Sequence, residues 1–263
     1  MTTALSVNVN KIAWLRNARD GDRPDLIQCC RKIIQAGAQG ITVHPRSDQR
    51  HIRPADVYAV NDLVHELNVE YNIEGNPSVG RLSNGYPGFL ELVEDTCPTQ
   101  CTLVPDNATQ LTSDHGWDLS NEVNFECVRT YIRRIHEIGA RVSLFLDPEP
   151  QMVERARESG ADRIELFTGP WCDLVAHGGL TSEYAQQCLA KYVIAASRAR
   201  ELGLQVNAGH DLDLGNVGHF CSQVPVSEVS IGHALVADAL AYGLERTVKL
   251  YVSAIQDAFD TER

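Results

Sequence analysis

Eight short runs of apolar and β-branched residues recur along the chain, and segments with apolar residues at helical spacing separate them. The runs span residues 5–9, 40–44, 70–74, 101–105, 141–147, 163–169, 204–210 and 228–233. The helical patterns span residues 25–36, 54–67, 89–95, 121–138, 149–159, 182–202 and 234–259. Such short apolar runs are typical of strands buried on both faces, as in a parallel sheet. The order therefore favours a repeated strand–helix unit.

Glycine ends several of the helical patterns in the same way. In AGAQGITVH, IGARVSLF, SGADRIELF and LGLQVNAGH, a glycine follows the helix and a strand begins two or three residues later. Glycine is the usual left-handed stop of a helix before a tight turn. Eight units in 263 residues give about 33 residues each, the size of one βα module. The sequence predicts an α/β fold, a (β/α)8 TIM barrel that forms a single domain over residues 1–263.

The main competing fold is an open, doubly wound sheet. In that fold, a phosphate-binding glycine motif is expected after the first strand, but the segment NKIAWLRNAR found there has no glycine. In a barrel, side chains at the C-terminal ends of the strands face the active-site mouth. The polar residues at these ends are Asn8, Asn10, His44, Glu74, Asp147, Thr168, Asn207, His210 and His233.

Three histidines and one glutamate at a single rim indicate proton transfer. Imidazole titrates near neutral pH, and a partly desolvated glutamate can be raised toward it. A metal site is not expected, because the paired histidines of metal-dependent hydrolase barrels are replaced by Asn8 and Asn10, and amides are poor zinc ligands. A Schiff base is not expected either, since Lys11 follows the first strand only as a predicted loop residue. Acid–base chemistry remains the main mode.

The charge distribution indicates an anionic ligand at the same rim. The first 53 residues carry nine Lys and Arg against four Asp and Glu, although the whole chain has a net charge of −12. An acidic chain argues against a nucleic-acid partner. The basic residues follow the first two strands, where guanidinium groups would suit phosphate, and they are Lys11, Arg16, Arg19, Arg46, Arg50, His51 and Arg53. Glycine-containing turns after strands seven and eight suit further phosphate contacts.

The N-terminal residues do not resemble a secretory signal, and no apolar stretch approaches 18 residues. The eight cysteines include no CxxC pair and are expected to be reduced thiols. These features predict a cytoplasmic protein with no membrane contact.

Several segments together resemble the pyridoxine 5′-phosphate synthase family. They are VNVNKIAWLRNAR (7–19), GITVHPRSDQRHI (40–52), NIE (72–74), LVP (103–105), VSLFLD (142–147), VNAGHDL (206–212) and IGHAL (231–235). The resemblance implies a (β/α)8 barrel that forms a homo-octamer. It also implies a transferase that condenses 3-amino-2-oxopropyl phosphate with 1-deoxyxylulose 5-phosphate into the pyridoxine phosphate ring, with release of phosphate and water. No metal or bound organic cofactor is implied.

The resemblance also assigns roles by matched position. His44 and Glu74 would be proton acceptors and His210 a proton donor. The aminoketone phosphate would be held by Asn8, Arg19, Gly232 and His233, and the deoxyxylulose phosphate by Arg46, His51 and Thr112. Thr112 lies in a segment, residues 105–118, that closes over the substrates in the family. Asn10, Lys11 and Asp211, also expected to contact substrate, depart from the family pattern of Asp-His after strand one and Gly after the histidine of strand seven.

Two other functions remain open from the sequence. The departures from the family pattern at Asn10, Lys11 and Asp211 could mark a related phosphosugar aldolase or isomerase that uses the same rim. A barrel that only senses a phosphorylated ligand is the other alternative. The set of His44, Glu74 and His210 disfavours the sensor, because a binding protein has no need of three proton carriers.

Overall fold

The eight strands pair in parallel, in chain order, and close into a barrel in which β8 pairs with β1. The computed structural model describes residues 3–107 and 109–260. The strands are β1 (Ala4–Asn8), β2 (Gly40–Val43), β3 (Glu70–Gly75), β4 (Gln100–Leu103), β5 (Arg141–Leu146), β6 (Arg163–Phe167), β7 (Gln205–Gly209) and β8 (Glu228–Ile231). The predicted (β/α)8 fold is confirmed. The two ends of the predicted domain, at 1 and 263, lie outside the described residues.

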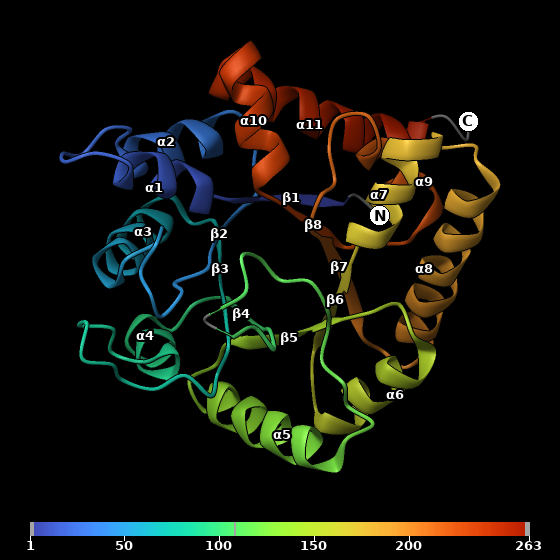
Figure 1. Cartoon of the computed structure of the whole chain (residues 1–263), viewed down its shortest axis with the longest axis horizontal. Coiled ribbons are helices and arrows are strands. Elements are labelled where there is room, and N and C mark those ends of the chain that lie inside the picture. Colours follow the sequence, from blue (N-terminus) through green and yellow to red (C-terminus); the bar gives the residue numbers. More distant parts are fainter. Residues whose placement is uncertain (1–2, 108, 261–263) are drawn as a thin grey trace.

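Helices surround the barrel as a ring (Figure 1). They are α1 (Asn10–Asn17), α2 (Leu26–Gln35), α3 (Pro54–Leu67), α4 (Phe89–Thr96), α5 (Glu122–Glu137), α6 (Pro150–Ser159), α7 (Gly169–Gly178), α8 (Glu183–Glu201), α9 (Val217–Gln223), α10 (His233–Tyr242) and α11 (Leu244–Asp260). None of these described helices is long and apolar enough to cross a membrane.

The predicted glycine stops are confirmed. Each of the four glycines has a positive φ and lies between a helix and the following strand, at Gly37, Gly139, Gly160 and Gly203. At Gly160, which directly follows α6, φ is 96° and the backbone N–H bonds to the Arg157 carbonyl at 3.1 Å. These turns set the short path from each helix into its strand.

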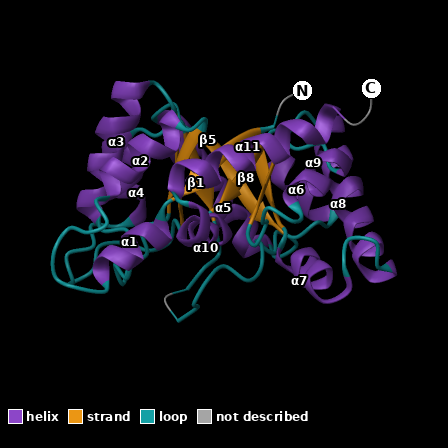
Figure 2. Cartoon of the chain, turned by 90° about the horizontal axis from the view of Figure 1, so that it is seen from above, coloured by secondary structure: helices purple, strands orange, loops and turns teal. Residues whose placement is uncertain are grey.

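Three short helices were not predicted, and one predicted helix is divided. The helices α1, α7 and α9 follow β1, β6 and β7, and α1 and α7 lie toward the same end of the barrel (Figure 2). The pattern over 234–259 forms α10 and α11, which are separated at Gly243 with φ of 82°. Lys11 and Arg16 are therefore on a helix, where a loop was predicted, and this fixes their spacing.

The inward faces of the strands are polar, although continuous apolar strands were predicted. Hydrogen bonds cross the barrel between strands that are not neighbours, such as Asn207 of β7 with Gln100 of β4 at 3.5 Å. The buried inward residues at mid-barrel are Ser6, Thr42, Asn72, Thr102, Ser143, Glu165, Asn207 and Ser230. Barrel interiors usually hold branched apolar side chains. The apolar residues of these strands instead alternate with the polar ones and belong to the main hydrophobic core.

Candidate active site

A cavity of about 320 Å³ opens at the C-terminal ends of the strands. Every residue that was assigned a catalytic or substrate-binding role, except Arg19, lines it, namely Asn8, Asn10, Lys11, His44, Arg46, His51, Glu74, Thr112, His210, Asp211, Gly232 and His233. Residues that were not predicted also line it, including Val104, Leu111, Ser113, Phe145, Glu165 and Ser230. The mouth of the barrel thus brings together side chains separated by more than 200 positions in the sequence.

Four of the seven basic residues predicted at the mouth do not line this cavity, namely Arg16, Arg19, Arg50 and Arg53. Arg19 is exposed in a bend after α1 and does not line the cavity, so its predicted phosphate contact stays a prediction. Arg16 is buried and pairs with Asp56 of α3, with nitrogen–oxygen distances of 2.5 and 2.8 Å. This bidentate pair ties α1 to α3. The prediction that Arg16 faces the mouth is wrong, because the α1 helix turns its side chain toward α3.

Asn8 and Asn10 hold the backbone and side chains of the catalytic candidates in place. The Asn10 side-chain oxygen accepts a hydrogen bond from the His44 backbone N–H at 2.9 Å. The Asn8 side chain accepts from the Asn10 N–H at 3.0 Å and donates to Glu74 at 3.3 Å. A Cβ on Gly232 would lie 3.1 Å from the Asn8 Cβ, so glycine permits this close approach of β8 to β1.

His44 and Glu74 form a buried pair at the centre of the cavity. The His44 Nδ1 lies 3.7 Å from Glu74 Oε2. Burial, with the nearby charges of Arg46 and Arg50, lowers the pKa of His44 to about 3. Burial, with the neighbouring Glu165, holds the pKa of Glu74 well above its usual range. The imidazole is therefore neutral at pH 7, the form that a proton acceptor requires, and the carboxyl next to it is shifted toward its protonated form.

Glu165 adds a second carboxyl to the same cavity. It is buried, lines the cavity, and has an oxygen, Oε2, with no hydrogen-bond partner among the described residues. Burial raises its pKa, and the neighbouring Glu228 raises it further. Gly209 makes room for this side chain, because a Cβ there would overlap Glu165 Oε1. A carboxylate in the middle of the apolar run RIELF is the signal that could have identified it.

A lysine and a neutral histidine lie at the rim of the cavity. The Lys11 amine sits 4.3 Å above the Trp14 ring, and burial followed by the charges of Arg46 and Arg50 lowers its pKa. His51 accepts a hydrogen bond from the Ile52 N–H on Nδ1 at 2.9 Å, which leaves Nε2 as the donor of the neutral ring. Burial, with the charges of His44 and Arg46, lowers its pKa to about 3.

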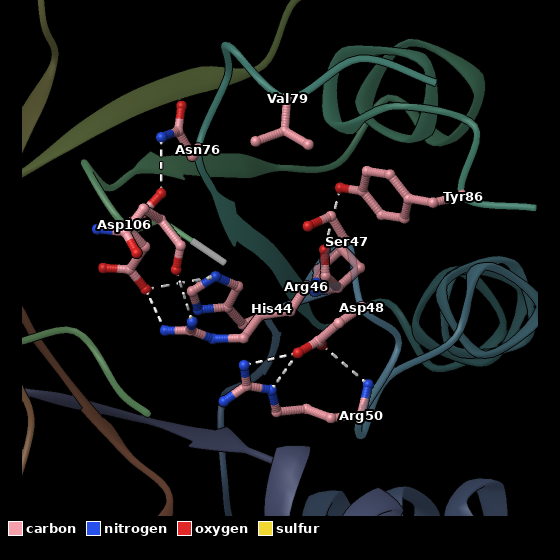
Figure 3. Close-up of a pocket in the computed structure, with 11 residues that line it drawn as sticks. His44, Arg46, Ser47, Asp48, Arg50, Asn76, Val79, Tyr86 and Asp106 are labelled. Atoms are coloured by element: carbon pink, nitrogen blue, oxygen red, sulfur yellow. Dashed lines mark hydrogen bonds and ion pairs between the residues drawn. The ribbon is translucent and has the colours of Figure 1, made fainter. Parts of the chain in front are cut away.

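Asp106 joins the rim to the segment that follows β4 (Figure 3). Its buried carboxylate forms an ion pair with Arg46, accepts from Ser113 at 2.8 Å and lies 3.8 Å from His44 Nε2. Burial raises its pKa, although Arg46 opposes the rise. Arg46 also donates to the Gln110 carbonyl at 3.0 Å. Sequence reasoning missed Asp106, although it directly follows the LVP that ends a strand.

The segment 105–118 reaches across the cavity as far as β7. Thr112 Oγ1 lies 2.8 Å from His210 Nε2. Residue 108, inside this segment, lies outside the described residues. The contact places the predicted lid residue Thr112 directly against the predicted proton donor.

The raised pKa values of buried glutamates and the lowered pKa values of buried histidines predict how the stability of the fold depends on pH. Three buried glutamates, Glu74, Glu165 and Glu228, have raised pKa values, that of Glu228 reaching about 7 by burial and the nearby Glu70. Above pH 4.5, the ordinary pKa of a glutamate, these carboxyls therefore keep protons in the folded chain that they lose in the unfolded chain. Stability consequently falls as pH rises. The two histidines act oppositely, since stability is lost as pH falls from 6.5 toward 3.

We therefore expect a stability maximum below pH 6.5, with a fall on both sides. Of these five groups, only the glutamates contribute to the pH dependence above pH 6.5, each by about 1.4 kcal/mol per pH unit while it titrates. Urea unfolding at a series of pH values measures this slope. Glu228→Gln should reduce the loss between pH 6.5 and 7.5, and an unchanged slope would show that burial does not hold this proton.

Comparison with known proteins gives consistent results. The family model described as "Pyridoxal phosphate biosynthesis protein PdxJ" matches residues 5–257. Pyridoxine 5′-phosphate synthase of Xanthomonas campestris pv. campestris (strain B100) is 52% identical over 256 residues, covering 97% of both chains. The synthase of Bacteroides thetaiotaomicron is 45% identical over 255 residues, covering 97% of this chain and 100% of the relative.

Among solved structures, orotidine 5′-monophosphate decarboxylase from Methanocaldococcus jannaschii superposes with a TM-score of 0.60. The match covers 97% of this chain and 99% of the decarboxylase at 9% sequence identity. At this identity the likeness supports the barrel fold alone.

Proposed function

The chain belongs to the PdxJ family of pyridoxal phosphate biosynthesis proteins, and from this premise we propose that it catalyses the pyridoxine 5′-phosphate synthase reaction. The reaction condenses 3-amino-2-oxopropyl phosphate with 1-deoxyxylulose 5-phosphate and releases phosphate and water. The observation that carries the proposal is the polarity of the cavity, which has buried carboxyls at one part and cations at its rim, with His44 near both.

The carboxyl part suits the amine of the first substrate. Glu74 and Glu165 are raised in pKa because each is buried near other acids. An ammonium group placed between them would favour their ionised forms and be held by them. Gly232 and His233 begin α10, and the first turn of a helix presents backbone N–H groups that bind phosphate. We assign the aminoketone phosphate to this part of the cavity, with Asn8 beside it.

The cationic rim suits the phosphate of the second substrate. Lys11, Arg46 and His51 line it from the segments after β1 and β2. Arg46 brings a guanidinium charge, and His51 offers an Nε2–H. Thr112 adds a hydroxyl from the segment that crosses the mouth. The two phosphates would then lie on opposite sides of the His44–Glu74 pair.

The bond-forming and bond-breaking steps of the condensation are accompanied by proton transfers that these side chains can perform. The amine attacks the ketone, water leaves, a carbon beside a carbonyl is deprotonated and phosphate departs. Neutral His44 accepts the proton that attack or deprotonation releases, and Glu74 relays it at 3.7 Å. His210 supplies protons to leaving oxygens. Each such group contributes on the order of 10²–10⁴ in rate.

The finer properties stay part of the proposal. The enzyme would be a transferase whose C–N bond formation relies on general acid–base catalysis. The homo-octamer implied by the resemblance and the cytoplasmic location predicted from the sequence are carried with it. Light scattering of the purified protein tests the octamer directly.

The function is tested by supplying the purified protein with each substrate alone and with both. We expect phosphate release only when both are present. Cleavage or interconversion of a sugar phosphate without release of inorganic phosphate would favour the aldolase or isomerase alternative. Binding of both substrates without any turnover would favour the sensor.

Lys11→Ala should raise KM for deoxyxylulose phosphate more than KM for the aminoketone. Loss of a charged contact to phosphate corresponds to a rise of about 10–100-fold. Steady-state kinetics with one substrate varied at a time measures the two constants. Lys32→Ala is the matched control, because Lys32 pairs with Glu245 at 3.6 Å and does not line the cavity. Equal increases in both KM values for Lys11→Ala would refute the placement of this residue.

A further inference from the structure

The carboxylate of Asp211 is directed at the neighbouring histidine. Asp211 Oδ2 lies 2.7 Å from His210 Nδ1, and the other ring nitrogen, Nε2, lies 2.8 Å from Thr112 Oγ1. We infer that Asp211 is a positioning residue that fixes the tautomer and orientation of His210, and that it is not a contact for substrate phosphate. The inference rests on the proposed role of His210 as proton donor.

The two ring nitrogens of His210 have different partners, and this determines which one carries the proton. A carboxylate only accepts hydrogen bonds, so Nδ1 must be the donor to Asp211. In the neutral ring, Nε2 then has a free lone pair and accepts from the Thr112 hydroxyl. When the ring is protonated, Nε2–H becomes a donor toward the cavity and the carboxylate stabilises the cation. The pair thus directs the exchangeable proton to the substrate side.

The backbone shows that this carboxylate occupies a position where glycine would be more relaxed. His210 and Asp211 have φ values of 83° and 61°, in the left-handed region. Glycine enters that region freely, whereas other residues are strained there. Aspartate tolerates it better than most, through its short polar side chain. A strained acid beside a cavity histidine indicates that the side chain, rather than the turn, is what the position requires.

Surrounding groups keep Asp211 charged and hold the ring in place. The hydrogen bond from His210 lowers the pKa of Asp211, and the charges of His233 and Lys11 add to this. Asp211 Oδ2 also lies 3.5 Å from where a Cβ on Gly169 would be, at the start of α7, where the helix dipole favours an anion. The Phe167 ring meets the imidazole edge-on, with centroids 5.1 Å apart.

This geometry also separates the carboxylate from the phosphates. A carboxylate placed beside a phosphate would repel it. The Oδ2 atom of Asp211 already accepts a hydrogen bond from His210. Removing the carboxylate should therefore slow proton transfer and leave substrate affinity almost unchanged. A phosphate-facing residue would instead alter KM.

The test compares wild type with Asp211→Gly and Asp211→Asn, using protein labelled with ¹⁵N-histidine. We expect the His210 signals of wild type to show the Nδ1–H tautomer, and those of Asp211→Gly to show a mixture. In Asp211→Gly, kcat should fall by about 10–100-fold, with both KM values within about threefold of wild type. In Asp211→Asn, kcat should fall at least as far, because the asparagine amide can donate to Nδ1 and impose the wrong tautomer. The Tm of Asp211→Gly should equal or exceed that of wild type.

The matched control is Asp162→Asn, which alters another aspartate–histidine pair, with His136 at 2.8 Å, at the opposite end of the barrel. It should leave kcat and the His210 signals unchanged. An unchanged His210 tautomer in Asp211→Gly would overturn the inference, as would a rise in KM with kcat preserved or a drop in Tm that accounts for lost activity. The NMR result is independent of turnover, so failure of the proposed reaction would be recognised separately.

Discussion

Replacing Glu74 with glutamine is expected to lower kcat by about 10²–10⁴-fold while the barrel stays folded. Glutamine keeps an oxygen that can accept from Asn8 at the same place, but its amide cannot take or give a proton. His44, 3.7 Å away, would then lose its relay partner. Single-turnover kinetics with both substrates bound measures the chemical step without interference from product release.

The same substitution should not destabilise the protein. The carboxyl of Glu74 is buried among acids, and a neutral amide removes the cost of ionising it there. We expect the free energy of unfolding at pH 8 to be equal to or higher than that of wild type. Glu70→Gln is the control, because Glu70 is on the same strand at the opposite end of the barrel and should leave kcat unchanged. Wild-type activity in Glu74→Gln would exclude Glu74 from the proton path.

Replacing Arg46 with methionine is expected to cause the largest loss of stability. Arg46 pairs with the buried Asp106 and donates to the backbone of the segment that covers the mouth. Removing it leaves a buried carboxylate without its partner, which costs about 3–5 kcal/mol in comparable cases. KM for deoxyxylulose phosphate should rise as well, because a positive charge near the phosphate is gone.

A double substitution separates these two effects. In Arg46→Met with Asp106→Asn, no buried charge remains unpaired, and most of the lost stability should return. The KM for deoxyxylulose phosphate should stay high in the double variant, since the guanidinium is still absent. Urea unfolding and steady-state kinetics on the two single variants and the double variant measure both quantities. Recovery of the KM together with the stability would show that Arg46 acts only through Asp106.

The barrel could be predicted because its signals are local and repeated. Glycine stops such as Gly160 and Gly203 recur between helix and strand, and strand ends bring His44, Glu74 and His210 to one mouth by topology alone. Side-chain partners could not be predicted in this way. Arg16 looked like a phosphate ligand because it follows a strand, but its direction depends on α1 and on Asp56 of a different helix.

The polar barrel interior was missed because apolar and polar residues alternate within the short strands. In RIELF, Glu165 is surrounded in sequence by apolar residues that belong to the outer core, so the run looks uniformly buried. Asp106 was missed because only the fold brings it to Arg46 and His44. Asp211 could be found in the sequence, but its role depends on the direction of one carboxylate oxygen.

The central claim is that the residues of this cavity catalyse the condensation of two phosphorylated substrates into one pyridine ring. It is tested most directly by supplying ¹⁵N-labelled 3-amino-2-oxopropyl phosphate together with 1-deoxyxylulose 5-phosphate, and following the products by NMR and mass spectrometry. We expect the label in the ring nitrogen of pyridoxine 5′-phosphate, with one phosphate released per ring. Phosphate release without a labelled pyridine ring would contradict the assignment.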